Sequence, residues 1–170
     1  RFKPEDINPE KIEPDLAERW EKSKDGLVWT FYLRKGVKFH RGYGELTAED
    51  VKFSLEKAAN KATSGFAADY AALAKVEALD KYTVRLTFKS AIPSVLGILT
   101  NYHGGYIVSK KAVEEKGDKF KFDPIGTGPF MLKDYIPKEK VVEVRHPEYF
   151  RGKAKLDRVE LWFMPDASSR

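Results

Sequence analysis

The sequence has no cysteine among its 170 residues, and it has only two methionines and three histidines. The absence of cysteine excludes disulfide bonds, thiolate metal sites and cysteine nucleophiles, although it says little about the compartment. Long hydrophobic runs are also absent, because the longest, such as residues 92–99, fall far short of the roughly 20 residues that a membrane-spanning helix needs. We therefore expect no transmembrane helix. The opening RFKPEDINPEKIEPDL has no apolar segment either, so we expect no signal peptide in this chain.

Motifs of catalysis and of metal binding are missing as well. His40, His103 and His146 lie far apart and have none of the spacings that bring two metal ligands together on one helix or strand. No serine stands in a GxSxG elbow, and no carboxylates form a recognisable acid–base pair. The stretch GTGPF lacks the GK[ST] ending of a phosphate-binding loop, and Pro129 removes a backbone donor. We therefore predict a protein that is not an enzyme and holds no metal or cofactor.

Charge of one sign is not concentrated in any stretch. The net charge is +5, from 31 Lys and Arg against 26 Asp and Glu, and both signs mix in stretches such as EKSKD. A nucleic-acid interface would gather basic residues on one element with aromatic residues between them. We therefore predict a solvated surface of mixed charge and no nucleic-acid partner. A basic interaction module, which docks a partner or an anionic surface, remains an alternative of another class.

The sequence does contain enough apolar material for a core, with 42% hydrophobic and 13% aromatic residues. Residues 27–33 of DGLVWTFYLRKG alternate like a strand, yet both faces carry bulky side chains, and the turn at residues 34–36 ends the strand. A second short strand is expected at residues 37–39. Thr47 and Asp50 form a capping-box pattern that predicts a helix over residues 48–59.

The remaining elements have weaker patterns. Leu16 and Trp20 are four residues apart, which favours a short helical turn. Pro93 suits the start of a helix, and Ser109 suits the cap of a helix that ends at Gly117. Strands are expected just after the loop NYHGG and at residues 75–79, 82–88, 130–135, 141–145 and 158–164. This mixture of hairpin strands and helices predicts an α+β (mixed α/β) fold with a mostly antiparallel sheet.

Two loops have a composition that suits a ligand cleft. NYHGGY surrounds two glycines with hydrogen-bonding and stacking side chains, which makes Tyr102 and His103 candidate ligand-binding residues. An ordinary polar loop is the alternative. SGFAADY places Phe66 and Tyr70 four residues apart, and core packing of both is the default interpretation.

Four stretches, in this order, carry a resemblance to a known family. They are PDLAERWEKSKDGLVWTFYLRKGVKFH, LTAEDVKFSLEKA, VEALDKYTVRLTF and GTGPFMLKDYIPKEKVVEVRHPEYFRGKAKLDRVELWFMPDAS. Together they cover nearly the whole chain. The chain resembles the extracytoplasmic solute-binding proteins of ABC importers, specifically the dipeptide/oligopeptide-binding family (solute-binding family 5).

The resemblance implies a fragment of a periplasmic-binding-protein-like type II lobe with flanking helices. Residues 10–125 would form the small middle domain of the family, and residues 126–170 an incomplete return segment of the first lobe, while the remaining lobe is absent. The strand at residues 27–33 would then be buried on both faces, with its aromatic side chains between the sheet and the helix that Thr47 caps.

The implied function is non-catalytic capture of a solute outside the cytoplasmic membrane, for delivery to the permease subunits of an ABC importer. Di- and oligopeptides are the first choice of solute; oligosaccharides and nickel complexes are alternatives within the family. The implied location is periplasmic or extracellular, with membrane association through the transporter or a lipid anchor. We expect the chain alone to bind any solute weakly, because half a cleft lacks the second set of contacts.

The resemblance also suggests roles for individual residues. The segment SGFAADY matches the one with which the family offers an aromatic side chain to the cleft, so Phe66 is the first candidate and Tyr70 the second. Gly126, Thr127 and Gly128 would be structural residues near the crossing between the lobes.

Overall fold

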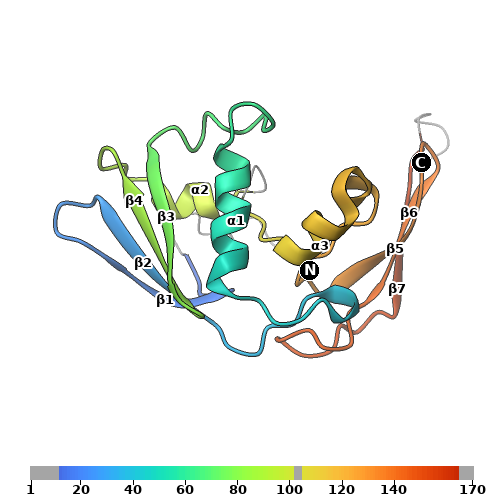
Figure 1. The fold of residues 1–170 in the computed structure, drawn as a ribbon. Coiled ribbons are helices and arrows are strands. Elements are labelled where there is room, and N and C mark those ends of the chain that lie inside the picture. Colours follow the sequence, from blue (N-terminus) through green and yellow to red (C-terminus); the bar gives the residue numbers. More distant parts are fainter. Residues whose placement is uncertain (1–11, 102–104, 165–170) are drawn as a thin grey trace, which may run out of the picture.

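The computed structural model describes residues 12–101 and 105–164, and it contains two antiparallel sheets flanked by helices (Figure 1). The larger sheet has the strand order β1-β2-β4-β3, and the smaller has the order β5-β6-β7. This arrangement confirms the predicted α+β fold. The strands are β1 Ala17–Lys22, β2 Val28–Leu33, β3 Leu73–Asp80, β4 Thr83–Phe88, β5 Phe130–Ile136, β6 Lys140–Arg145 and β7 Arg158–Trp162; the helices are α1 Ala48–Ala59, α2 Val95–Leu99 and α3 Lys110–Lys116, with the 3-10 helices η2 His40–Gly42 and η3 Gly117–Phe122.

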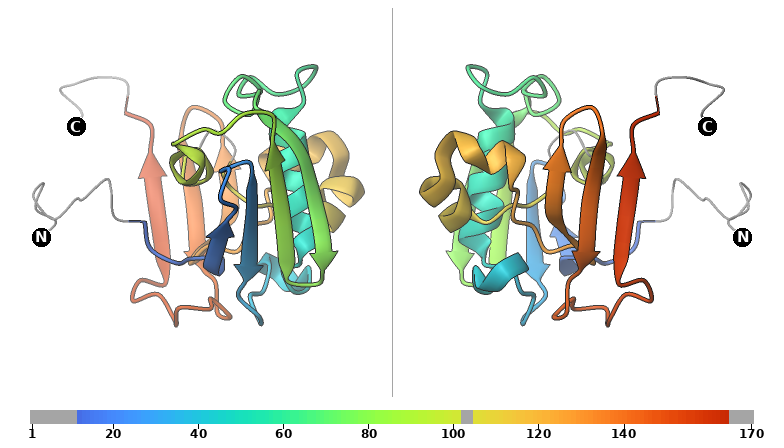
Figure 2. Two further views of the ribbon diagram at one scale, coloured as in Figure 1. Left: turned by 90° about the vertical axis from the view of Figure 1, so that its left-hand side faces the viewer. Right: turned by 90° about the vertical axis from the view of Figure 1, so that its right-hand side faces the viewer.

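The two sheets lie on opposite sides of the molecule (Figure 1, Figure 2). Helix α1 packs along the four-stranded sheet, and α3 lies between α1 and the three-stranded sheet. The boundary predicted at residues 125 and 126 falls in the connection between η3 and β5. The division into two domains at that point stays a prediction.

Helix α1 has the bounds that the sequence predicts, 48–59. The N–H and the hydroxyl of Thr47 donate to the Asp50 carboxylate at 3.0 and 2.9 Å, and Glu49 adds a second acid to the positively polarised first turn. The buried positions follow helical spacing and face the sheet or the segment before α3; they are Ala48, Asp50, Val51, Ser54 and Leu55.

Strand β2 is buried on one face only, so the predicted burial of both faces is wrong. Trp29, Phe31 and Leu33 lie in the core between the sheet and α1, whereas the residues that alternate with them are half-buried. The reason is that α1 covers one face of the sheet. On the other face, the guanidinium of Arg19 lies 3.3 Å from the ring centre of Tyr32 and shields it partly from water.

Residues 17–22 form the strand β1 instead of the predicted helical turn. Trp20 lies opposite Phe31 in the β1–β2 register, with 6.5 Å between the ring centres. This cross-strand contact favours the strand, and the helical spacing of Trp20 from Leu16 does not reveal it.

Two short strands predicted from the sequence do not form. Residues 37–39 make a single bridge, between Lys38 and Glu45, because η2 begins at His40 and ends the extended stretch. Residues 105–108 are coil, held by side chains of α1 rather than by a neighbouring strand.

The other predicted elements are confirmed with small shifts. The β3–β4 hairpin turns just after Asp80, and α2 begins two residues after Pro93. Helix α3 begins where the Ser109 hydroxyl accepts the Ala112 N–H at 3.2 Å, and it ends at Gly117, whose φ of 51° suits glycine. In the ranges 12–101 and 105–164, no helix is both long and apolar enough to cross a membrane.

Candidate functional site

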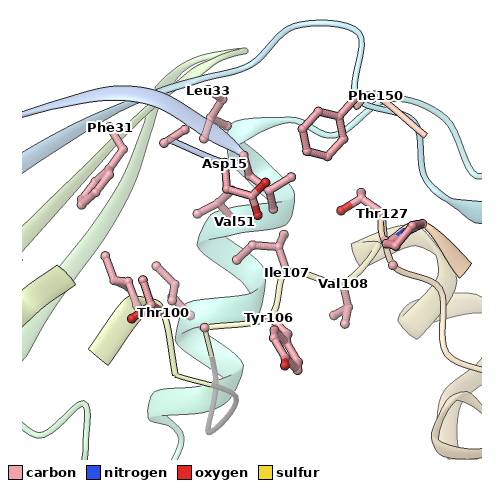
Figure 3. A pocket seen from close by; sticks show the side chains of 18 of the residues that line it. Asp15, Phe31, Leu33, Val51, Thr100, Tyr106, Ile107, Val108, Thr127 and Phe150 are labelled. Carbon is pink, nitrogen blue, oxygen red and sulfur yellow. The ribbon is translucent and has the colours of Figure 1, made fainter. Parts of the chain in front are cut away.

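A groove with a volume of about 860 Å³ lies between the two sheets (Figure 3). Its walls come from β1 and β2, from α1, from residues 105–108, and from the crossing segment, residues 126–129, which leads into β5. The side chains that point into it in Figure 3 include those of Phe31, Leu33, Val51, Ile107, Thr127 and Phe150.

The apolar wall of the groove continues the core of the four-stranded sheet. Phe31 and Leu33 alternate on the buried face of β2, and Val51 and Leu55 lie one turn apart on α1, so all four reach the same side. From the sequence we predicted that the aromatic residues of β2 belong to the core. Only 9% of Phe31 is exposed, which confirms that it belongs to the core, and it also forms part of the groove wall.

Buried polar groups of α1 hold the opposite wall in place. The Ser54 hydroxyl donates to the Asp50 carbonyl at 2.8 Å and accepts the Val108 N–H at 3.0 Å. The Asp50 carboxylate accepts the Lys110 N–H at 3.0 Å. These bonds fix the chain on both sides of Ser109, and thereby place Ile107 and Val108 at the groove.

The crossing segment forms the floor of the groove beside a buried histidine. The N–H of His40 donates to the Gly126 carbonyl at 2.9 Å, and its ring Nε2 donates to the Gly128 carbonyl at 3.0 Å. Burial lowers the pKa of His40 below its usual value. Thr127, between the two glycines, is buried and lines the groove. These contacts support the structural role proposed for Gly126, Thr127 and Gly128, which stays a prediction.

An ion pair closes one rim of the groove. Arg151 Nη2 lies 2.8 Å from the Asp15 carboxylate and donates to the Pro14 carbonyl at 2.7 Å. Arg34 Nε donates to the Asp15 carbonyl at 3.2 Å, and both guanidinium groups lie within 6 Å of the Phe150 ring centre. The segment before β1 is thereby fastened to the residues that follow β6.

The charge of the groove lining is one-sided. Glu13, Asp15 and Glu143 line it, and in the described part of the chain no Lys or Arg does so. A neutral apolar group or a cation suits such a lining, whereas a carboxylate would be repelled except near Arg34 and Arg151 at the rim.

The residues that the sequence predicted for a ligand do not line this groove. Phe66 is 43% exposed in the turn region after α1, and Tyr70 is 95% buried in the core, with 5% exposed. Tyr102 and His103 lie outside the described residues. A ligand contact by any of the four stays a prediction.

Several groove residues were not singled out by the sequence. Asp15 and Phe150 come together only through the tertiary fold, so no local pattern marks them. Tyr106, which is 72% exposed at the groove, belongs to the loop NYHGGY, and the aromatic composition of that loop was the available signal. Within the described ranges, no three His, Cys, Asp or Glu side chains gather as a metal site.

Comparisons with known proteins identify the family to which this chain belongs. The family model of the bacterial extracellular solute-binding proteins, family 5, middle, matches residues 11–170. The heme-binding protein A of Haemophilus influenzae is 33% identical over 94% of this chain and 33% of its own length. The di/tripeptide-binding protein 2 of Pseudomonas aeruginosa is 34% identical over 92% of this chain and 34% of its own length. The chain thus spans about a third of the length of these relatives, which are named as binding proteins rather than as enzymes, in agreement with the sequence analysis.

A solved structure agrees with the same family. The binding protein MoaA of A. tumefaciens R10, in complex with mannopinic acid, is 49% identical, covers 100% of this chain and superposes with a TM-score of 0.94, while the match covers 34% of that protein. The predicted resemblance and the predicted fold of a type II periplasmic-binding-protein-like lobe are therefore confirmed. The chain belongs to the bacterial extracellular solute-binding proteins of family 5.

Proposed function

We propose that this chain is part of an extracytoplasmic binding protein that captures a small organic solute and presents it to the permease subunits of an ABC importer. The observation that carries the proposal is the family match over residues 11–170. The groove supports it, because a hollow of about 860 Å³ with apolar walls and a polar rim has the size and lining of a ligand site.

The solute that we propose first is a small organic acid of the mannopinic acid type. The support is the 49% identity to the protein solved with that ligand, which exceeds the 34% identity to the di/tripeptide-binding relative. In the groove, the apolar walls would hold the neutral part of the solute. Its carboxylate would lie near Arg34 and Arg151 at the rim, or against a second lobe, since the inner lining is acidic.

Peptides, the first choice from the sequence, are the second candidate. The relative from Pseudomonas aeruginosa is named for di- and tripeptides, and the acidic residue Glu143 in the groove lining suits a peptide amino group better than a carboxylate. Oligosaccharides and nickel complexes stay alternatives within the family, as does a basic interaction module outside it.

A thermal-shift screen tests the proposal. Mannopinic acid, di- to pentapeptides, β-linked oligosaccharides, nickel–histidine and hemin are each added to the 170-residue chain and to a two-lobed protein that contains it. A ligand present at about 100 times its Kd stabilises the folded state by about 2.7 kcal/mol, which raises the Tm by about 5 °C or more for a domain of this length and by less for the longer two-lobed protein. We expect the two-lobed protein to respond to mannopinic acid and the chain alone to respond little.

Salt separates solute capture from the alternative class. Binding of a small solute with one charged group should weaken only modestly between 50 and 500 mM NaCl, whereas docking to an anionic polymer weakens steeply with ionic strength. A two-lobed protein that responds to no small solute, but to heparin at low salt, would overturn the proposal in favour of a basic interaction module.

A further inference from the structure

Two buried histidines meet at the junction of the two sheets. The rings of His40 and His146 lie edge to face, with 4.9 Å between their centres and 73° between their planes. His40 is 6% exposed and His146 1%, and the two lie more than a hundred positions apart in the sequence. They are the buried ionisable groups nearest the crossing segment, and solute binding as proposed above does not use them.

The pair binds the crossing segment from both sides. The backbone N–H of His40 donates to the Gly126 carbonyl, and its ring Nε2 donates to the Gly128 carbonyl. The N–H of His146 donates to the Pro129 carbonyl at 2.8 Å, and the ring Nε2 of His146 lies 3.2 Å from the Lys38 carbonyl. Residues 126–129 are thus held between the first residue of η2 and the residue that follows β6.

The Nε2 bonds form with either a neutral or a charged ring, and it is the surroundings of Nδ1 that favour a neutral His40 ring. Each Nε2 faces a carbonyl oxygen and therefore carries a hydrogen, so in a neutral ring Nδ1 presents a lone pair. The lone pair of His40 Nδ1 accepts the Gly126 N–H at 3.4 Å. A proton bound to Nδ1 would break this hydrogen bond and repel the hydrogen of the Gly126 N–H. His146 Nδ1 is buried, and in the described part of the chain a proton bound to it would find no acceptor.

The charged groups around the pair do not compensate the positive charge that a bound proton would bring. On the η2 side stands Arg41, which pairs with Asp123 at 2.6 Å; Lys116 pairs with the same carboxylate. At the end of β6 stands Arg145, which pairs with Asp157. The crossing segment itself carries no charged side chain. The nearby acids are therefore already engaged by cations, and no carboxylate contacts either ring among the described residues.

We propose that His40 and His146 form a proton-sensitive latch that fixes the crossing segment, and with it the three-stranded sheet, against the four-stranded half of the molecule. The latch is closed when the His40 ring is neutral and opens when that ring binds a proton. Because His40 and residues 126–129 also line the groove, opening would alter the groove. That last consequence for solute release rests on the proposed function; the latch itself does not.

The direction of the pH effect follows from the environment of His40. Burial, and after it the neighbouring His146 and Arg41, lower its pKa in the folded state below the ordinary value of 6.5, although the bond to Gly128 opposes the shift. The open state therefore binds protons more readily, so the latch loses stability as the pH falls below about 6.5. At pH 5.5, one such histidine favours opening by at most about tenfold.

Hydrogen exchange on the 170-residue chain without solute tests the latch. Protection factors, corrected for intrinsic exchange, are measured from pH 7.5 to 5.5 at the amides of His40, Gly126 and His146, with the amide of Leu55 in α1 as the internal control. We expect protection at the three latch amides to fall, by at most about tenfold, while that of Leu55 is unchanged. Equal protection at both pH values, or a parallel loss at Leu55, would overturn the proposal.

A variant and a ring titration add independent tests. His40→Gln keeps a donor near the Gly128 carbonyl but cannot titrate, so it should make the protection of Gly126 much less dependent on pH. In the wild-type chain, the NMR signals of the His40 ring should titrate below pH 6.5, and titration at or above 6.5 would contradict the latch. Solute affinity, measured separately, leaves these outcomes unaffected: a working latch without solute binding would reject only the proposed function.

Discussion

The Asp50 carboxylate in the first turn of α1 accepts the backbone N–H of Lys110, the first residue of α3, at 3.0 Å. Its second oxygen accepts the N–H of Thr47 at 3.0 Å. One buried side chain therefore satisfies donors at the beginnings of two helices, which would otherwise lack partners. Through this contact, α1 positions the segment that forms the groove wall next to α3.

Replacement of Asp50 should destabilise the fold strongly. Asp50→Ala leaves two backbone N–H groups without an acceptor, which we expect to cost about 3 kcal/mol of the free energy of unfolding. Glu49→Ala is the matched control, since Glu49 is an exposed acid of the same helical turn, and its loss should cost about 0.5 kcal/mol. Urea denaturation measures both. Similar midpoints for the two variants would show that the bond from Asp50 to Lys110 contributes little.

Glu45 should make stability depend on acid pH. Its carboxylate accepts bonds from Lys81, from the Gly36 N–H and from the Tyr82 hydroxyl, and these contacts, that of Lys81 foremost, lower its pKa from 4.5 to about 2. A carboxyl group with a lowered pKa stabilises the folded state above pH 4.5 and loses this contribution as the pH falls towards 2.

The Glu45→Gln variant measures this contribution. We expect it to be less stable than the wild type by about 1 kcal/mol at pH 7, because water screens the partly exposed pair with Lys81. The difference should shrink steadily between pH 4.5 and 2. Glu114→Gln, at an exposed position of α3, is the control for loss of one negative charge. A difference that stays constant over this pH range would rule out the role of Glu45.

The sequence predicted the elements whose signals are local. Helix α1 was predicted with its observed ends because Thr47, Asp50 and the apolar spacing lie within a dozen residues. Strand β1 was missed because its extended conformation depends on the pairing of Trp20 with Phe31, which is a contact between separate segments. The half-burial of Tyr32 was missed for a related reason, since only the packing of α1 decides which face of the sheet is covered.

The groove lay beyond sequence reasoning because it is formed by residues from distant parts of the chain. Arg151 bonds to Pro14, 137 positions away, and no pattern in either segment indicates the other. The resemblance to solute-binding proteins did predict the family, while the structural role that it suggests for Gly126 to Gly128 stays a prediction. It could not predict that His40 and His146 hold this crossing, because the three segments meet only in the folded chain.

Phe66 should contribute to solute binding if it contacts the solute as proposed. Phe66→Ala in the two-lobed protein should then weaken the affinity for the solute found in the thermal-shift screen about tenfold, the effect of losing one aromatic contact. Leu79→Ala is the matched control, because Leu79 in β3 has the same exposed fraction, 43%. Isothermal titration calorimetry gives both affinities. Equal affinity of the two variants would remove Phe66 from the ligand site.

A single substitution of Tyr70 can show whether this residue acts in the core or in ligand binding. Its hydroxyl is buried and, among the described residues, has no hydrogen-bond partner, so its presence in the core is costly. Tyr70→Phe should therefore leave the free energy of unfolding unchanged or raise it by up to about 1 kcal/mol. Tyr82→Phe is the control in the opposite direction, because the Tyr82 hydroxyl donates to Glu45 at 3.0 Å and its removal should cost about 1 kcal/mol.

The solute affinity of Tyr70→Phe completes the argument. If Tyr70 acts only in the core, the variant keeps the affinity of the wild type, because no polar group that reaches a solute has been removed. If the hydroxyl bonds to a solute in the two-lobed protein, the affinity falls while the stability of the solute-free protein does not. A loss of affinity without a loss of stability would place Tyr70 in the ligand site, and its burial in this chain would then reflect a side chain that must move to bind.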